Sequence, residues 1–143
     1  LLFFAWYAKR NGCRVATFDP APGHIDGARQ MMQEQLPDCL ERVSFFACDG
    51  LECCNCIAEP IELLYLDAMD GEIQNVTEVE NAENQWYVSV VQSVEHLLPV
   101  GALILIDDFA TKGKSVGPYL LAHGWQQRTD IVNGNNMALF ERL

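Results

Sequence analysis

Residues 97–109 have the sequence LLPVGALILIDDF, which is the clearest indication of the fold class of the chain. Its centre, residues 102–106 (ALILI), is almost purely aliphatic over the length of one strand. A strand that is apolar on both faces is typical of a parallel sheet covered by helices on both sides. Pro99 ends the helical pattern before it, and Asp107-Asp108 follows the strand. The stretch therefore predicts a buried strand of an α/β protein.

Three more strands are predicted upstream, and each of them ends at an acidic residue. They are residues 14–19 (RVATFD) with Asp19 at the end, 43–48 (VSFFAC) before Asp49-Gly50, and 61–66 (IELLYL) before Asp67. One acid after a strand is commonly a turn or capping residue. In parallel α/β sheets, however, ligands bind at the carboxyl ends of the strands. Acids after all four strands therefore predict a site along one edge of the sheet.

Helical periodicity alternates with these strands. A buried helix is predicted at residues 1–8 and ends at Asn11-Gly12, and a second is predicted at 28–36, after a turn at Pro20, Pro22 and Gly23, and ends at Pro37. A third is predicted at 77–98, where Thr77 and Glu80 form a capping box. A fourth is predicted at 115–123 and ends at Gly124. Residues 125–132 and 137–141 flank Asn133-Gly134, a strong signal for a tight hairpin. The order predicts one α/β domain over residues 1–143, mostly parallel, with a C-terminal antiparallel hairpin.

Charge and hydropathy exclude several classes of partner. The formal net charge is −11, and residues 43–111 contain thirteen Asp and Glu but no Lys or Arg. Such a surface repels phosphate backbones, so nucleic acid is not an expected partner. No apolar run approaches the roughly 18 residues of a membrane span, so no membrane association is expected.

The cysteines indicate a reducing compartment. Their positions, 13, 39, 48, 53, 54 and 56, do not have the spacing of a disulfide scaffold. A zinc site at Cys53, Cys54 and Cys56 would need a fourth ligand, and neither His24 nor His96 stands at a standard spacing. Reduced thiols in a cytoplasmic protein are the favoured interpretation.

With these motifs in place, nearly the whole chain resembles the class I S-adenosylmethionine-dependent methyltransferases. Residues 15–32 (VATFDPAPGHIDGARQMM) look like that family's second strand and helix, residues 43–50 (VSFFACDG) like its third strand, and residues 97–109 like its fifth. The resemblance implies a Rossmann-like sheet whose last strand lies between the two before it in the sheet. It also implies that Asp19 holds the cofactor ribose and that Asp49, with Gly50, contacts the adenine amine.

Within that class, the resemblance is nearest to small-molecule O-methyltransferases of the catechol and caffeoyl-CoA type and their bacterial relatives, which residues 113–125 (GKSVGPYLLAHGW) also resemble. In those enzymes the acid after the fourth strand and a pair after the fifth hold a divalent metal. Asp67, Asp107 and Asp108 match these positions, and Asp67 also borders the cofactor. Three oxygen ligands suit Mg²⁺ or another divalent cation, which acidifies a substrate hydroxyl. Asp107-Asp108 could instead cap a helix without metal, or Lys112 could fold back to relieve the charge repulsion.

Two departures from the family pattern affect the predicted site. The catechol-type enzymes carry a Lys three residues after the fourth-strand acid, whereas this chain has Asp70, which becomes the predicted base unless the metal alone suffices. The first strand and its glycine-rich loop are expected to be missing, and residues 1–10 look like the helix that follows that loop. The four strands are expected in one sheet, but those ending at Asp19 and Asp67 should not pair directly without the first strand.

Three functions follow from the sequence. The first is methyl transfer from S-adenosylmethionine to a small hydroxylated molecule, and a homodimer is a compatible assembly. The residues before Leu1 would distinguish this function from the second. The second is an NAD(P)-dependent Rossmann oxidoreductase, because Asp19 would suit a nicotinamide ribose equally well; it would need a G-x-G-x-x-G loop. The third is a non-catalytic methyltransferase-like binding domain that keeps the sheet alone. The closing hairpin argues against the oxidoreductase.

Overall fold

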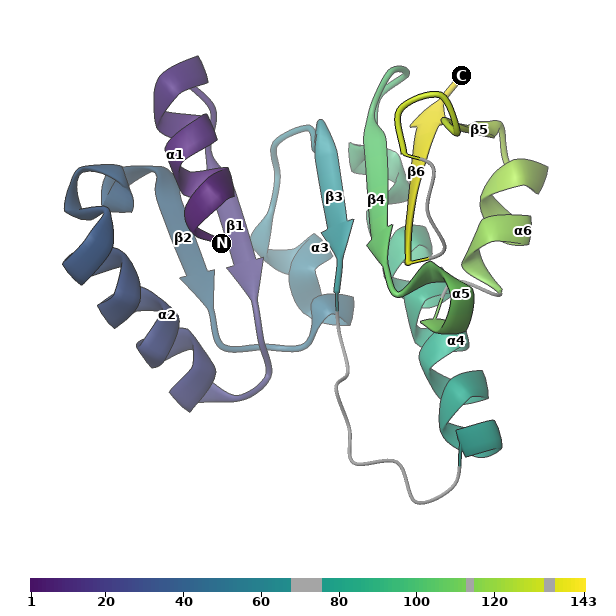
Figure 1. Ribbon diagram of the computed structural model, residues 1–143, viewed down its shortest axis with the longest axis horizontal. Coiled ribbons are helices and arrows are strands. Elements are labelled where there is room, and N and C mark those ends of the chain that lie inside the picture. The colour runs from purple at the N-terminus through teal and green to yellow at the C-terminus, as the bar shows by residue number, and fades with distance from the viewer. Residues whose placement is uncertain (68–75, 113–114, 133–135) are drawn as a thin grey trace. The chain divides into compact units, whose positions relative to one another are not determined.

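The computed structural model describes residues 1–67, 76–112, 115–132 and 136–143, without the side chains of 76–84 and 111–112. Contacts divide the chain into two compact units, Leu1–Cys56 and Ile57–Leu143 (Figure 1). Each unit has its own sheet and its own helices. In the described parts of the chain, no helix is both long and apolar enough to cross a membrane.

The first unit is a two-stranded parallel sheet with helices. Its elements are α1 (Leu2–Asn11), β1 (Val15–Phe18), α2 (Pro22–Gln35), the 3-10 helix η1 (Pro37–Arg42), β2 (Val43–Phe46), the 3-10 helix η2 (Gly50–Glu52) and α3 (Cys53–Cys56). The strands pair in register from Val15 opposite Val43 to Phe18 opposite Phe46. The predicted strand-helix-strand order of this segment is confirmed.

The core of the first unit is small. Ala5 of α1, Met32 of α2 and Cys39 of η1 are buried together, and Val43 and Phe45 pack against them from β2. Alternate residues of a strand point to opposite faces, so these helices cover the face that carries Val43 and Phe45. No residue of β1 or β2 is fully buried. This sheet is therefore only partly covered by its own unit.

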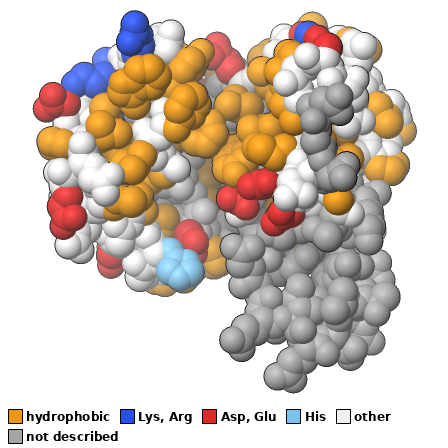
Figure 2. All heavy atoms as spheres, in the orientation of Figure 1, with side chains coloured by type: hydrophobic (Ala, Val, Ile, Leu, Met, Phe, Trp, Pro, Cys, Tyr) orange, Lys and Arg blue, Asp and Glu red, His pale blue; other side chains and the backbone are white. Residues whose placement is uncertain are grey.

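The first helix forms as predicted, but it is not buried on all sides. Only Ala5 and Ala8 of α1 are buried, whereas Phe3, Trp6 and Tyr7 are 66%, 46% and 50% exposed. Figure 2 shows hydrophobic side chains at the surface over this helix. Because α1 packs against its unit through Leu2 and its two buried alanines, these three aromatic side chains face outward. The predicted stop is confirmed: Gly12 takes the left-handed conformation that favours glycine, with φ of 74°.

The second helix begins earlier than the sequence predicted. Pro22 and Gly23, predicted as turn residues, form the first turn of α2, which runs to Gln35. Proline suits the first helical position because the N–H that it lacks has no partner within the helix there. Helical periodicity starts to show only at Ala28, because Ile25 is the one buried residue in the first turns. Pro37 ends the helical run and starts η1, as a proline stop requires.

The second unit has a four-stranded mixed sheet. Its elements are β3 (Leu63–Leu66), α4 (Val76–Val94), the 3-10 helix η3 (Glu95–Leu97), β4 (Leu103–Asp107), α5 (Phe109–Lys112), α6 (Val116–Ala122), β5 (Trp125–Gln127) and β6 (Met137–Arg142). The strand order is β3-β4-β6-β5, with β3 and β4 parallel and β6 antiparallel to both its neighbours. The last strand of the chain thus lies between the two before it, as predicted.

The core of the second unit forms around β4, β6 and α4. Ile104 and Ile106 of β4 and Phe140 of β6 have no exposed surface. The buried positions of α4, at residues 87, 90, 91 and 94, recur at steps of three and four, so one face of this helix is buried. The predicted aliphatic strand at residues 102–106 forms as β4, but burial on both faces is not complete, because Leu103 and Leu105 are only half-buried. The predicted capping side chains, Thr77 and Glu80, lie outside the described residues.

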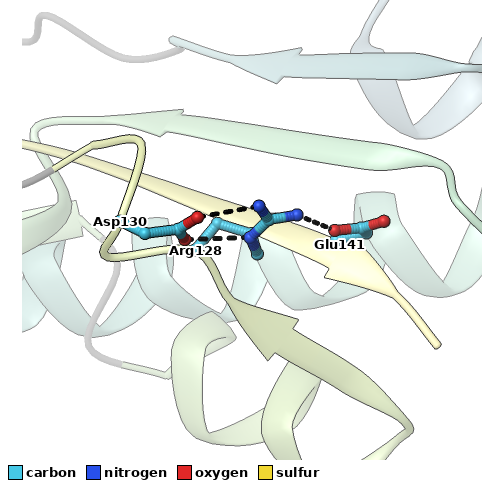
Figure 3. Close-up of polar contacts among 3 residues, drawn as sticks. All are labelled: Arg128, Asp130 and Glu141. Carbon is cyan, nitrogen blue, oxygen red and sulfur yellow. Dashed lines mark hydrogen bonds and ion pairs between the residues drawn. The ribbon is translucent and has the colours of Figure 1, made fainter.

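The closing strands pair as predicted, but the connection between them is longer than a tight hairpin. β5 ends at Gln127 and β6 begins at Met137, whereas the sequence predicted strand up to residue 132. Arg128 holds the chain there: its guanidinium binds Asp130 at 2.8 and 2.9 Å and also binds Glu141 of β6 (Figure 3). The chain turns at residues 128–132, where the amides of Ile131 and Val132 both donate to the carbonyl of Arg128. Asn133-Gly134, the predicted turn, lies outside the described residues.

The expectation of one continuous sheet is corrected. Within the described residues, no hydrogen-bonded ladder joins the β1-β2 sheet to the β3-β4-β6-β5 sheet. Because β1 and β3 belong to different units, the expectation that they are not direct neighbours in the family's sheet stays a prediction. The α/β class, with parallel pairs and a C-terminal antiparallel pair, is nevertheless as predicted.

Candidate functional site at the strand ends

Two acidic residues follow the strands of the first unit. Asp19 comes directly after β1, and its backbone N–H donates to the carbonyl oxygen of Phe46, the last residue of β2, at 3.2 Å. Asp49 lies three residues after Phe46, and Gly50 begins η2. Because the carboxyl ends of parallel strands meet at one edge, the two predicted cofactor ligands of this unit lie at the same edge of its sheet.

Each of these two carboxylates accepts a hydrogen bond from a backbone amide two residues further on. The N–H of Ala21 donates to Asp19 Oδ1, and the N–H of Leu51 donates to Asp49 Oδ1, both at 2.8 Å. Aspartate forms such local turns readily because its short side chain reaches its own backbone. These turns help to fix the direction of both carboxylates.

The second oxygen of Asp19 contacts a histidine. His24 Nδ1, from the first turns of α2, lies 3.1 Å from Asp19 Oδ2, and its side chain is 75% exposed. A carboxylate offers about four acceptor positions, so the Ala21 and His24 contacts leave about two for a ligand. From the sequence, His24 was a residue that could touch a ligand, with nothing to decide it. The signal in the sequence was its position five residues after Asp19, in a helix that begins at Pro22 and brings the His24 side chain back toward the end of β1.

A cysteine lies beside Asp49, but its thiol is poorly suited to be a nucleophile. Burial raises the pKa of Cys48, and the neighbouring Cys56 thiol and the charges of Glu52 and Asp49 raise it further. The thiolate is the reactive form of cysteine, so a raised pKa disfavours covalent chemistry here. No disulfide joins any of the six cysteines, all of which are described.

In the second unit, two acids meet at the ends of neighbouring strands. Asp67 follows β3 and Asp107 ends β4, and the register places Leu66 opposite Ile106. The phenol oxygen of Tyr65 lies 3.2 Å from Asp67 Oδ2 and 3.1 Å from Asp107 Oδ2. Side chains two residues apart on a strand share a face, which brings Tyr65 and Asp67 together. The structure thus joins two of the predicted ligands through a residue that the sequence reasoning missed.

The Tyr65 phenol stays protonated over the neutral range. Burial raises its pKa above the ordinary tyrosine value, and the charge of Asp67 and the hydrogen bond to Asp107 raise it further. The phenol is therefore a hydrogen-bond donor to the carboxylates. The signal available in the sequence was the Tyr-x-Asp spacing at the end of a predicted strand, in the stretch YLD at residues 65–67.

Asp108 differs from the two acids around Tyr65. It is the one non-glycine residue with positive φ, 48°, in the described chain, and its backbone N–H donates to Asp107 Oδ1 at 2.9 Å. Aspartate tolerates this conformation better than most residues do. The chain turns sharply here, and the next amide, that of Phe109, donates to the carbonyl of Asn136. Asp107 is thus engaged at both oxygens.

The predicted metal site is not assembled in the part of the chain that the structure describes. No three His, Cys, Asp or Glu side chains there are grouped so that they could hold a metal ion, and Asp67, Asp107 and Asp108 are all among the residues searched. The reason is local: the Tyr65 phenol lies between Asp67 and Asp107, and the chain turns at Asp108. These residues do not fit a shared divalent cation.

Two other features bear on the site. Asp70, the predicted base, and the side chain of Lys112 lie outside the described residues. A hollow of about 340 Å³ in the first unit is lined by Trp6, Lys9 and residues 35–39, and none of the strand-end acids contributes to it. The acids after the strands, and not this hollow, are therefore the candidate site.

Comparison with known proteins identifies the fold but not the family. No protein-family model matches the sequence, and a search of curated proteins finds no relative. Solved structures do match. A methyltransferase from Geobacter sulfurreducens is 20% identical with a TM-score of 0.63, over 91% of this chain and 58% of its own.

Two further matches differ from each other in their described activity. An rRNA methylase from Streptococcus thermophilus is 14% identical with a TM-score of 0.62, over 91% of this chain and 74% of its own. An O-methyltransferase from Bacillus cereus, solved with SAH, is 14% identical with a TM-score of 0.58, over 89% of this chain and 61% of its own. This chain therefore has the Rossmann-like fold of methyltransferases and spans a little over half the length of the Geobacter sulfurreducens enzyme.

Proposed function

We propose that the chain belongs to an S-adenosylmethionine-dependent methyltransferase whose cofactor is held at the strand ends. The observation that carries this proposal is Asp19, fixed at the end of β1 by the Ala21 amide with acceptor capacity to spare. A ribose diol donates two hydrogen bonds, and a carboxylate fixed by one local bond can accept both. The methyltransferase fold, and S-adenosyl ligands in solved structures that share it, support the same assignment.

The other predicted cofactor contacts extend this proposal. Asp49 and Gly50 lie at the same edge of the β1-β2 sheet as Asp19 and would contact the adenine amine. Asp67, the other predicted cofactor contact, follows β3 in the second unit and stays a prediction. The position of β6 between β4 and β5 disfavours the nicotinamide alternative, since a doubly wound dehydrogenase has no need of such a strand.

The proposed reaction is a direct displacement, in which the protein mainly aligns the nucleophile, the methyl group and the sulfur. The acceptor is proposed to be a hydroxyl of a small molecule. The acidic surface supports this choice, because residues 43–111 contain no Lys or Arg to bind a nucleic-acid backbone. Asp70 stays the predicted proton acceptor, and no step is assigned to a divalent cation because the strand-end residues do not fit one.

Calorimetry with S-adenosylhomocysteine tests the cofactor site. Replacing Asp19 by Ala should weaken binding by about 1–3 kcal/mol, the cost of leaving polar partners unpaired. Asp38→Ala is the matched control: this exposed acid of the same unit pairs with Lys9 and lies in η1, at the amino end of β2, and its loss should leave the affinity unchanged. Equal affinity for Asp19→Ala and wild type would remove Asp19 from the site. Tighter binding of NADH than of S-adenosylhomocysteine would favour the oxidoreductase.

The substrate class needs a separate test. Methyl transfer from labelled S-adenosylmethionine should be detected with a panel of small phenols and catechols and not with ribosomal RNA. Transfer to RNA alone would contradict the small-molecule proposal while leaving the cofactor assignment intact. Asp70→Asn should lower the rate on hydroxyl acceptors and spare cofactor affinity, because a base acts only in the transfer step.

A further inference from the structure

The hydroxyl of Tyr65 lies where a shared cation would have to lie. Its oxygen is 3.2 Å from Asp67 Oδ2 and 3.1 Å from Asp107 Oδ2, so it contacts one oxygen of each carboxylate. Both distances exceed the usual 2.7–2.8 Å of a hydroxyl donor, as expected when one proton is shared between two acceptors. A cation bridging the same two oxygens would need the space that the phenol fills.

The groups around the Tyr65 phenol hold it in this position. Asp107 Oδ1 accepts the Asp108 amide, so both oxygens of Asp107 are already engaged. Tyr65 stands opposite Leu105 in the parallel ladder and is half-buried, so its ring is held by the sheet. Moving the phenol away would break two contacts to charged groups, which are stronger than bonds between neutral partners.

We infer that Tyr65 is a positioning residue whose phenol holds the carboxylates of Asp67 and Asp107 together and occupies the place between them that a divalent cation would take. The acids at the ends of β3 and β4 therefore do not form a metal centre. If the proposed methyl transfer is correct, its rate does not depend on a divalent cation. Only this last consequence rests on the proposed function.

Titration of the protein with Mn²⁺ at physiological ionic strength, followed by calorimetry, tests the inference without cofactor or substrate. Wild type and Asp107→Asn should show the same weak affinity, because Asp107 is not a ligand. Tyr65→Phe should bind Mn²⁺ at least about tenfold more tightly than wild type, equivalent to about 1.4 kcal/mol, since it frees the space between two carboxylates. The gain should disappear in the double variant Tyr65→Phe/Asp107→Asn.

Tyr119→Phe is the matched control. The Tyr119 phenol is also half-buried and donates to a carboxylate, that of Glu95, at 3.3 Å, but this bond lies on the helices of the same unit. Its removal should leave Mn²⁺ affinity at the wild-type level, which excludes a general effect of losing a phenol. Circular dichroism of each variant checks that it folds.

Two outcomes would overturn the inference. One is wild-type Mn²⁺ binding that Asp67→Asn and Asp107→Asn each weaken about tenfold or more. The other is a folded Tyr65→Phe variant that binds Mn²⁺ no better than Tyr119→Phe does. If Tyr65→Phe does not fold, the comparison of wild type with Asp107→Asn decides alone. Failure to bind S-adenosylhomocysteine would contradict the proposed function but not the role of Tyr65.

Discussion

At the edge of the first sheet, Asp19 and Asp49 each accept a hydrogen bond from an amide two residues away, whereas Asp67 and Asp107 of the second sheet meet through the Tyr65 phenol. The hydrogen bonds of the first arrangement are local, since each spans two residues. The second needs two strands, 42 residues apart in sequence between Tyr65 and Asp107, to pair in one register. Acids that look equivalent in the sequence therefore have different neighbours and are suited to different tasks.

The two sheets also differ in how well their strands are covered. No residue of β1 or β2 is fully buried, whereas β4 and β6 contain Ile104, Ile106 and Phe140 with no exposed surface. A buried side chain contributes to stability through both the surface removed from water and close packing. The second unit is therefore expected to contribute more of the stability, and the first unit to respond more weakly to substitutions in its core.

The largest effect is expected from the core of the second unit. Phe140→Ala should destabilise the protein by about 3–5 kcal/mol, because it leaves a cavity beside Phe109 that the packed sheet cannot close. Urea unfolding followed by circular dichroism measures the change. Phe3→Ala is the control, because the Phe3 ring is 66% exposed and its loss should cost less than about 0.5 kcal/mol. Equal costs for the two variants would contradict the assigned cores.

A smaller effect is expected from the core of the first unit. Met32 is fully buried, but the leucines around it are only half-buried and can move to fill a void. Met32→Ala should therefore cost about 2–3 kcal/mol, at the lower end for a buried methionine. Met31→Ala is the control: Met31 is half-buried, so its replacement should destabilise the protein less than Met32→Ala does. A cost for Met32→Ala above that of Phe140→Ala would reverse the ranking of the two units.

The local turns at the first sheet should contribute less still. Asp49→Ala removes the acceptor for the Leu51 amide and should cost about 1 kcal/mol, as for other capping residues. Asp49→Asn keeps a carbonyl oxygen at the same position and should lower stability by only about a few tenths of a kcal/mol. Thermal unfolding of both variants separates the hydrogen bond from the charge. If Asn were as costly as Ala, the charge and not the turn would hold Asp49.

The smallest effect is expected on the stability of the protein at low pH. The bidentate hydrogen bonds of Arg128 hold the pKa of Asp130 below its ordinary value. A carboxyl with a lowered folded pKa stabilises the protein above its unfolded pKa of about 3.9 and loses that contribution as the pH falls through the folded value. The stability difference between wild type and Arg128→Gln should therefore shrink below about pH 4. Unfolding at a series of pH values measures it; a difference that grows in acid would contradict the ion pair.

Much of the fold could be predicted from local patterns. The aliphatic run at residues 102–106 predicted a buried strand, and the alternation of strands and helices predicted parallel pairing. Both are present. The insertion of β6 between β4 and β5, which only the family resemblance implied, is present as well. The length of the final connection was mispredicted: β5 ends at Gln127, and the amides of Ile131 and Val132 donate to the carbonyl of Arg128, a turn that the pattern of residue types did not predict.

The site was predicted less completely. The acids were predicted at strand ends because each follows an apolar run, and the structure places them there. Their roles as cofactor ligands stay predictions. The predicted metal ligands are not grouped around one ion, because Tyr65 fills the space between Asp67 and Asp107 and the backbone of Asp108 turns left-handed. Spacing along the chain cannot show either feature. Asp70 stays a prediction outside the described residues.

The sequence by itself determined the elements, because strand and helix patterns act over a few neighbouring residues and each acid follows its strand in the chain. It also determined the turns of Asp19 and Asp49, whose hydrogen bonds span two residues. Only the tertiary structure decided which acids share a partner, since the register of β3 against β4 brings Tyr65 to Asp107. Contacts of that kind depend on long-range packing, which local sequence does not encode.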